Sequence, residues 1–458
     1  MPFRPEQAAV RFGCGFSPAL PLPASPEALL DGLRGPDQMA LRFPVETFSD
    51  YSRHLVKAAD MRRTARKTGT VDETRQALRT FRQGLGAQSH RWHANHLLRW
   101  TWSETPLRER LAQFWADHFT AAGKSNILVH SALPFVEEAI RPNMTGRFAD
   151  LLIATTTHPL MLHYLDQALS VGPNSQAASR VERLGGLNEN LAREVLELHT
   201  LGVNGAYTQA DVRQLAELFT GLTYQPETGF RFRPAFAEPG SETVLGQTYG
   251  GDPARLEPVL DALRDLAVHP ATARHVAGKL AVHFTGDAPD PALVEHVAAR
   301  FAETGGELMA VYAALIEHPA AWSDGPVNVK PPLDYIGSAC RALAVPPEHV
   351  QALDPKVLRR SLVNPLREMG QPLFRPSGPD GWPEEDAAWI TPPLVSARLR
   401  WALSAPAALC PELPDPRAFV DTALGPYATE PVRFAAAAAE SRRDAIGLVL
   451  SAPAFQRR

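Results

Sequence analysis

Prolines at the starts of helical segments limit how long most helices of this chain can be. The sequence has 42 prolines, and many directly precede a segment of helical periodicity, as in SPEALL, DPARLEP and DPKVLRR. Proline fits the first turn of a helix but breaks a helix interior, because it lacks the amide N–H. Ser25, Asp252 and Asp354 precede three of these prolines and are expected to be N-caps. We therefore predict many short helices.

Alternating patterns typical of strands are scarce along the chain. Residues 224–250 differ, because they are poor in helix formers and rich in proline, glycine and aromatics, which predicts a long irregular loop or a small β-hairpin. We expect a mostly α protein with a compact, bundle-like body in three parts. A helical part at 1–222 precedes an irregular or hairpin insertion at 223–251. A second helical part at 252–458 packs on the first and contains a Pro/Trp-rich segment at 371–393.

Charge and hydropathy exclude several classes of partner. The formal net charge is −4, which favours neither nucleic acid nor an anionic membrane. Residues 53–100 are rich in arginine and lysine, but acidic residues and leucines interleave them, so we interpret this region as a solvated helical face without nucleic-acid binding. No apolar stretch is long enough to span a membrane, and the first residues lack the apolar core of a secretory signal. The default expectation is a cytoplasmic protein.

The cysteines and the standard motifs give no metal or nucleophile signature. Cys14, Cys340 and Cys410 are far apart, with no CxxC pair, so neither a disulfide framework nor a zinc ribbon is implied. HExxH, P-loop, GxSxG and paired ExxH motifs do not occur. Nucleotide binding and standard serine-hydrolase chemistry are therefore not expected, and a divalent metal stays a candidate cofactor with no recognised ligand spacing.

The segment NENLAREVLELHTLGVNG at 188–205 predicts an amphipathic helix. Leu191, Val195 and Leu198 form an apolar stripe, and charged or amide side chains lie opposite. Two i,i+4 ion pairs around Arg193 are expected on the polar face. By itself this pattern is typical of a solvated helix.

Two histidines lie within apolar stripes. His199 falls in the stripe of helix 188–200, and His118 lies among apolar residues of LRERLAQFWADHF, with Asp117 at its edge. Such histidines are usually core residues bonded to a carbonyl or carboxylate. The alternative is a buried polar centre in which a carboxylate orients an imidazole. Nearby, HPLMLHYLDQ places Tyr164 and Asp166 in one short helical segment.

Several segments together resemble the bacterial domain-of-unknown-function 1800 family over nearly the whole chain. They include RFGCGFSP (11–18), FWADHF (114–119), LDQA (165–168), NENLAREVLELHTLGVNGAYTQADV (188–212), AELFTGL (216–222), VLGQTYGG (244–251), VKPPLDYIGSACRAL (329–343) and MGQPLFRPSGPDGWP (369–383). The resemblance implies a predominantly helical fold but no particular reaction. Genes of this family commonly neighbour those of the domain-of-unknown-function 1501 family, which resembles phosphatases and sulfatases, so it also implies such a protein as a partner.

The family pattern carries its motif positions onto residues of this chain. They are Trp115, Asp117, His118, Asn188, Glu189, Asn190, Arg193, Glu194 and Glu197. An aromatic residue often stands at position 199 in the family, which implies that His199 is not essential. Many members carry export signals, so the alternative location is periplasmic, by co-export with the partner. A motif that keeps two asparagines beside its charges implies a covered polar face, because buried charges require partners.

Two functional hypotheses remain open. In the first, the protein is a hydrolase- or lyase-like enzyme acting on a polar substrate. Glu189, Glu194 or Glu197 acts as general base or metal ligand, Asp117 orients His118, and substrate contacts come from Asn188, Asn190, Arg193, Trp115, Tyr164, Asp166 and Lys330. In the second, the polar residues form a structural network within a non-catalytic scaffold that acts through its partner.

Overall fold

The structure, a computed structural model, describes residues 3–458 except 125, 181–185, 323–324 and 326. The described chain is mostly helical and has two small antiparallel sheets, which confirms the predicted fold class. The N-terminal helices are α1 (Pro5–Arg11), α2 (Pro26–Arg34), α3 (Gln38–Arg42), α4 (Phe48–Thr68), α5 (Val71–Trp102), α6 (Pro106–His118), α7 (Ala132–Phe135), α8 (Phe148–Thr156), α9 (Pro159–Tyr164), α10 (Asn190–Glu194) and α11 (Gln209–Leu218).

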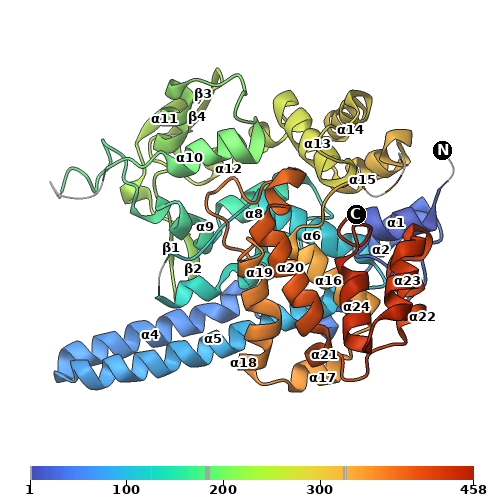
Figure 1. Ribbon diagram of the computed structural model, residues 1–458. Helices are drawn as coiled ribbons and strands as arrows, with labels where there is room; N and C mark the ends of the chain where they lie inside the picture. Colours follow the sequence, from blue (N-terminus) through green and yellow to red (C-terminus); the bar gives the residue numbers. More distant parts are fainter. Residues whose placement is uncertain (1–2, 125, 181–185, 323–324, 326) are drawn as a thin grey trace.

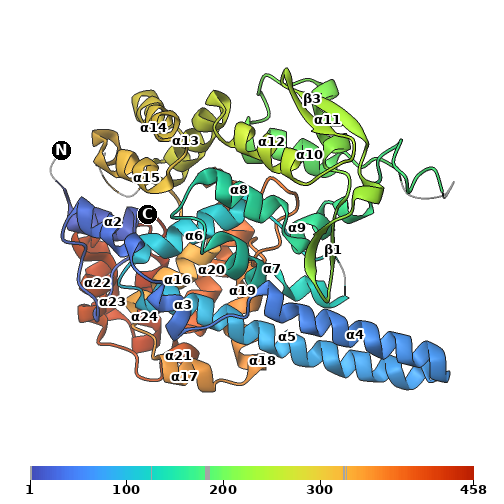
Figure 2. The ribbon, with the colours of Figure 1, turned by 180° about the vertical axis from the view of Figure 1, so that it is seen from behind.

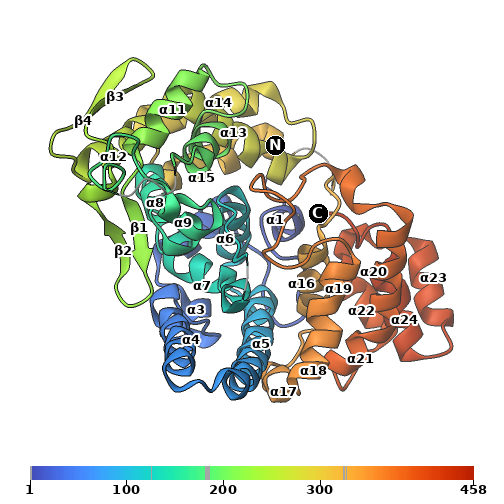
Figure 3. The ribbon, with the colours of Figure 1, turned by 90° about the vertical axis from the view of Figure 1, so that its left-hand side faces the viewer.

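The insertion contains two hairpins rather than one. Strands β1 (Leu222–Gln225) and β2 (Gly229–Phe232) pair antiparallel, with Leu222 opposite Phe232. Strands β3 (Gly240–Val244) and β4 (Gln247–Gly251) form the second sheet. Both lie on the side of the molecule opposite the C-terminal helices (Figure 3).

The described chain after the insertion is mostly helical. It comprises α12 (Glu257–Ala267), α13 (Pro270–Thr285), α14 (Pro291–Thr304), α15 (Leu308–Glu317), α16 (Pro332–Ala342), α17 (Pro347–Ala352), α18 (Pro355–Leu358), α19 (Asn364–Glu368), α20 (Pro392–Ser404), α21 (Pro406–Leu409), α22 (Pro416–Leu424), α23 (Glu430–Ala438) and α24 (Arg442–Ser451). One continuous cluster of buried apolar side chains includes residues from both helical parts. The division at 222 and 252 stays a prediction.

Most expected helix starts are confirmed. The Ser25 hydroxyl accepts a hydrogen bond from the Ala28 amide, and the Asp354 carboxylate accepts one from the Lys356 amide. Thr208 and Asp211 form a capping box at the start of α11. The prediction for Asp252 is wrong, because α12 begins only at Glu257.

The two longest helices lie where proline is absent. Between Pro44 and Pro106 the sequence has no proline, and this stretch contains α4 and α5, of 21 and 32 residues. They form an antiparallel hairpin that projects from the body as an arm (Figures 1 and 2). The C-terminal part of α5 enters the body and packs against α16, so the arm is anchored in the core.

Three π-helical turns interrupt the helical pattern of the described chain. They are η2 (Val136–Ile140), η4 (Val195–Thr200) and η7 (Arg359–Val363). The predicted helix at 188–200 is thus α10 followed by η4. π-helical turns are uncommon in proteins, and many of those known occur at functional sites.

Candidate functional site

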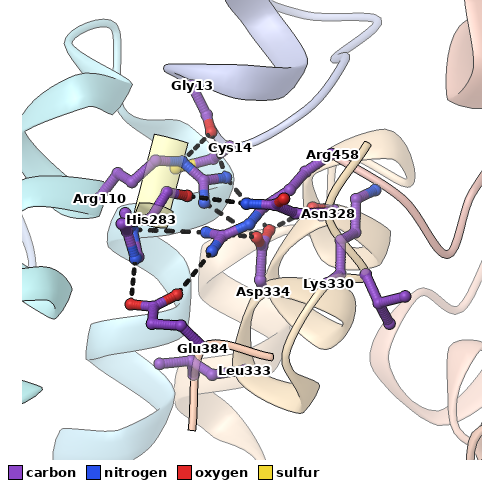
Figure 4. A network of polar contacts seen from close by, with 12 residues as sticks. Gly13, Cys14, Arg110, His283, Asn328, Lys330, Leu333, Asp334, Glu384 and Arg458 are labelled. Atoms are coloured by element: carbon purple, nitrogen blue, oxygen red, sulfur yellow. Dashed lines mark hydrogen bonds and ion pairs between the residues drawn. The ribbon is translucent and has the colours of Figure 1, made fainter. Parts of the chain in front are cut away.

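A buried ionic network joins segments that are far apart in the sequence (Figure 4). The Arg110 guanidinium of α6 donates to both carboxylate oxygens of Asp334 of α16, at 2.9 and 3.3 Å, and to the carbonyl of Gly13. Asp334 also accepts from Ser338 and lies 3.3 Å from Arg458. Burial alone would raise the pKa of Asp334, but the two arginines lower it to about 2. This carboxylate is therefore ionised at neutral pH.

His283 and Glu384 extend the network to the segment 371–393. Nδ1 of His283 lies 2.7 Å from the Glu384 carboxylate, and its Nε2 lies 3.4 Å from Arg458. Burial alone would raise the pKa of Glu384, but His283 and Arg458 lower it to about 2. An ionised carboxylate only accepts, so Nδ1 bears the proton and the neutral ring accepts from Arg458 at Nε2.

A cavity of about 40 Å³ adjoins this network, and we call it the central cavity. This volume holds a few water molecules or one polar group of a larger ligand. Its polar lining consists of Arg110, Gln113, Asp117, His283, Asp334, Gln371, Glu384 and Arg458, and its apolar lining includes Trp100, Phe114, Leu333, Trp382 and Trp389. Apolar walls with a few convergent polar groups are typical of a binding site.

Asp117 is the carboxylate of this cavity that lacks an ion pair within the described chain. Its Oδ1 accepts a hydrogen bond of 2.9 Å from the backbone N–H of Trp382, in the segment 371–393. Burial raises its pKa to about 7; Lys279 counteracts the shift, and Glu384 and Asp380 add to it. One cavity therefore contains two ionised, paired carboxylates and a third that exchanges a proton near neutral pH.

The segment 371–393 fits closely over Asp117 because Gly381 lacks a side chain. Gly381 has a φ of +83°, and a Cβ atom added there would lie 2.7 Å from Oδ2 of Asp117. We expect Gly381→Ala to lower the free energy of unfolding by about 1–3 kcal/mol through backbone strain and this clash. Urea denaturation followed by circular dichroism measures the loss.

Gly69 offers a matched control for this substitution. Its φ is +72°, but nothing lies within 4 Å of an added Cβ. Gly69→Ala therefore introduces the same strain without a clash, and its loss should be the smaller of the two. Equal losses of unfolding free energy in the two variants would show that the close contact between Gly381 and Asp117 does not affect stability.

Glu194 and Tyr164 lie near the same segment. Burial raises the pKa of Glu194 to about 7, with contributions from the negative charges of Glu197 and Asp380. Burial also raises the pKa of the Tyr164 hydroxyl, again with contributions from Glu194 and Asp380. Asp380 thus acts electrostatically on Asp117, Tyr164 and Glu194, which places these three predicted site residues around one loop.

The polar face of α10 and η4 is only partly covered. Both predicted ion pairs form, with Arg193 bonding Glu189 at 3.1 Å and Glu197 at 3.3 Å, and Gln209 of α11 bonds Arg193 and Glu189. The Arg193 side chain is 36% exposed. These residues form a partly solvated ladder, and Arg193 already has its carboxylate partners.

The two asparagines differ in environment. Asn188 accepts from the Asn190 amide at 2.9 Å and donates to the carbonyls of Leu165 and Asp166 at 3.4 Å, so it shapes the start of α10. Asn190 is exposed. Asp166 forms a partly exposed ion pair with Lys124 at 2.6 Å. Asn188, Asn190 and Asp166 do not line the central cavity.

His118 and His199 lie side by side in the core, with ring centroids 6.1 Å apart. Nε2 of His118 donates to the carbonyl of His199 at 3.2 Å, and Nε2 of His275 donates to the carbonyl of Leu198 at 2.9 Å. In a π-helical turn these late carbonyls lack helical partners, so the imidazoles cap them. The expected pair of Asp117 orienting His118 does not form, because each side chain has a different hydrogen-bond partner.

Trp115 and Lys330 are both buried. Nε1 of Trp115 donates to the Tyr312 hydroxyl at 2.6 Å within the core. Lys330 is only 4% exposed, and its ammonium lies 4.1 Å from the centre of the Phe455 ring. Burial lowers its pKa to about 8. It borders the ionic network through Asp334.

Within the described ranges, no group of three or more His, Cys, Asp or Glu side chains is placed to hold a metal ion. The described residues also contain no helix long and apolar enough to cross a membrane. Arg110, His283, Asp334 and Glu384 were not predicted as site residues. Charged side chains in the otherwise apolar sequences LRERLAQFW and PPLDYIGS were the available signal for Arg110 and Asp334.

The fold and the central cavity define a predominantly helical protein whose helices meet at a buried ionic centre. The chain matches a family model described as "Protein of unknown function (DUF1800)" over residues 11–457, and it belongs to that family. No curated protein and no solved structure matches the chain.

Proposed function

We propose that this protein is an acid–base enzyme of the hydrolase or lyase type, with Asp117 as the group that transfers the proton. The observation that carries this proposal is the contrast within the central cavity. Asp334 and Glu384 are paired and have pKa values of about 2, whereas Asp117 is unpaired and has a pKa of about 7. Environments that separate the pKa values of neighbouring carboxyls are typical of acid–base sites.

The surrounding residues suit a polar substrate with a flat face. Trp382 and Trp389 have ring centroids 6.1 Å apart and line the cavity beside Asp117. Gln113 and Gln371 supply amide groups that can bond a hydroxyl of the substrate. Glu194, whose pKa is also about 7, is the candidate for the second proton-transfer group.

The test combines a titration with an activity screen. The carboxyl pKa of Asp117 can be measured by ¹³C NMR, with assignment from the loss of its signal in Asp117→Asn, and we expect a value about three units above the usual one. Wild-type protein is also screened on p-nitrophenyl esters, glycosides, phosphates and sulfates, and on polysaccharides for lyase products. Any turnover should fall by about 10²–10⁴-fold in Asp117→Asn.

Asp150→Asn is the matched control, because Asp150 is an exposed residue in the first turn of α8. It should leave turnover and melting temperature unchanged. An ordinary pKa near 4 for Asp117, or full turnover in Asp117→Asn, would contradict the proposal.

One feature favours the non-catalytic alternative, in which the protein serves as a partner of a phosphatase- or sulfatase-like protein. The arm of α4 and α5 projects from the body, and its far half is mostly exposed. A scaffold with such an arm would keep its partner after Asp117→Asn but lose it when the arm is shortened. Co-purification of both variants with the partner separates the two hypotheses.

A further inference from the structure

A second pocket lies on a different part of the molecule and contains no acidic side chain. Its volume is about 220 Å³, and we call it the histidine–arginine pocket. It lies between α5, α7, η7, α19 and the first residues of the segment 371–393. Six basic side chains line it, namely His90, His93, His130, Arg359, Arg367 and Arg375, together with Ser89 and Asn364.

The positive charges around this pocket have no negative partner in the described chain. None of the three arginines forms an ion pair there, and Arg359 donates a hydrogen bond to the amide oxygen of Asn364, at 3.4 Å. Three guanidinium groups around one cavity repel one another unless an anion lies between them. An arginine that is surrounded by water needs no such anion. Three arginines that line one cavity can bind an anion together.

The floor of the pocket also lacks hydrogen-bond partners. The Nδ1 atoms of His90 and His93 are buried, and neither forms a hydrogen bond. Burial and the neighbouring His90 and His130 lower the pKa of His93 to about 3, while burial, His90 and Arg375 lower that of His130 to about 4. Buried polar atoms are normally satisfied, so both nitrogens are available to bond a ligand in the pocket.

The backbone is irregular on two sides of the pocket. Arg359 and Val363 belong to the π-helical turn η7. Phe374, in the facing loop, has a φ of +49° and packs its ring edge-on against His96, one turn beyond His93. Both conformations cost free energy and occur preferentially at functional sites.

We propose that the histidine–arginine pocket binds the phosphate or sulfate group of a small monoester. A guanidinium group can donate paired hydrogen bonds to two oxygens of a tetrahedral oxyanion. The three arginines at the mouth of the pocket provide such charge-assisted hydrogen bonds from several directions. The imidazoles of the floor supply further donors, and Ser89 and Asn364 suit polar substituents of the ester. The site is independent of Asp117 and of the proposed reaction.

Isothermal titration calorimetry at constant ionic strength tests this site, with inorganic phosphate, sulfate, glycerol 3-phosphate and chloride as probes. We expect saturable one-to-one binding of at least one of the three oxyanions, and none of chloride. In the double variant Arg359→Gln/Arg375→Gln, binding should weaken by at least about tenfold, because two charge-assisted contacts are lost. Phosphatidic acid vesicles, compared with phosphatidylcholine vesicles, distinguish a lipid headgroup from a soluble ester.

Arg360→Gln is the matched control, since Arg360 lies beside Arg359 in η7, is exposed and does not line the pocket. It should bind the same oxyanion within about twofold of wild type. The changed arginines of the double variant are exposed, so it should keep its circular dichroism spectrum and melting temperature. Absence of saturable oxyanion binding in wild-type protein, or equal weakening in the double variant and in Arg360→Gln, would overturn the proposal.

Discussion

Replacement of Asp334 with asparagine is expected to lower the free energy of unfolding by about 3–5 kcal/mol. The Asp334 carboxylate is 3% exposed and lies between Arg110 and Arg458, which are themselves buried. Asparagine keeps the shape but removes the charge, so two buried guanidinium groups lose their counter-ion. Urea denaturation followed by circular dichroism and tryptophan fluorescence measures the effect.

Asp261→Asn is the control for this prediction. Asp261 pairs with Arg264 on the surface of α12, where the two side chains are 54% and 47% exposed. Surface pairs of this kind contribute little to stability, so the variant should unfold close to wild type. If both variants lost the same small amount, the ionic centre would not be a major source of stability.

The buried neutral histidines are expected to lower the free energy of unfolding when the pH falls from 7 to 5. Burial, with help from Lys279 and His275, lowers the pKa of His199 to about 3, and burial and two neighbouring histidines lower that of His93 to a similar value. Between pH 6.5 and 3 the unfolded chain takes up these protons and the folded chain does not. Lowering the pH from 7 to 5 therefore lowers the free energy of unfolding by about 2 kcal/mol for each of these histidines.

Asp117 and Glu194 act in the opposite direction. Their raised pKa values mean that the folded protein takes up protons below pH 7, which stabilises it on acidification. The histidine contribution is therefore measured as a difference, with His199→Phe as the variant. The free energy of unfolding at pH 5, relative to its value at pH 7, should be about 2 kcal/mol higher in the variant than in wild type.

His296→Gln serves as the control for the pH series, because His296 is exposed on α14. Its pH dependence should follow that of wild type. If His199→Phe kept the pH dependence of wild type, the His199 imidazole would be protonated in the folded protein. That result would contradict the prediction.

Local signals in the sequence were sufficient to predict the helical architecture. N-caps before proline, the capping box of Thr208 and Asp211 and the two ion pairs of Arg193 all involve residues within four positions of one another. Asp252 failed as a cap because the chain runs four further residues before α12 begins. The second hairpin was missed because 224–250 was interpreted as one irregular unit.

The central cavity could be foreseen only in part. Asp117 and the segment 371–393 were singled out separately, but their contact joins residues 265 positions apart. Arg110 and Asp334 are 224 positions apart. A charged residue on an apolar helix face predicts burial, yet its partner depends on tertiary packing. The burial of Lys330 depends on tertiary packing as well, since Arg398 and Phe455, which contact it, are distant in sequence.

The π-helical turn η4 has a consequence for insertions and deletions in this family. Such a turn holds one residue more than the α-helical turn it replaces. Deletion of a single residue between 195 and 200 would restore regular winding, but it would rotate the preceding residues by about 100° relative to the carbonyls that His118 and His275 cap. Glu194, whose pKa the charge of Asp380 helps to raise, would be displaced as well. We expect homologous chains to keep the length of this turn even where they replace its side chains.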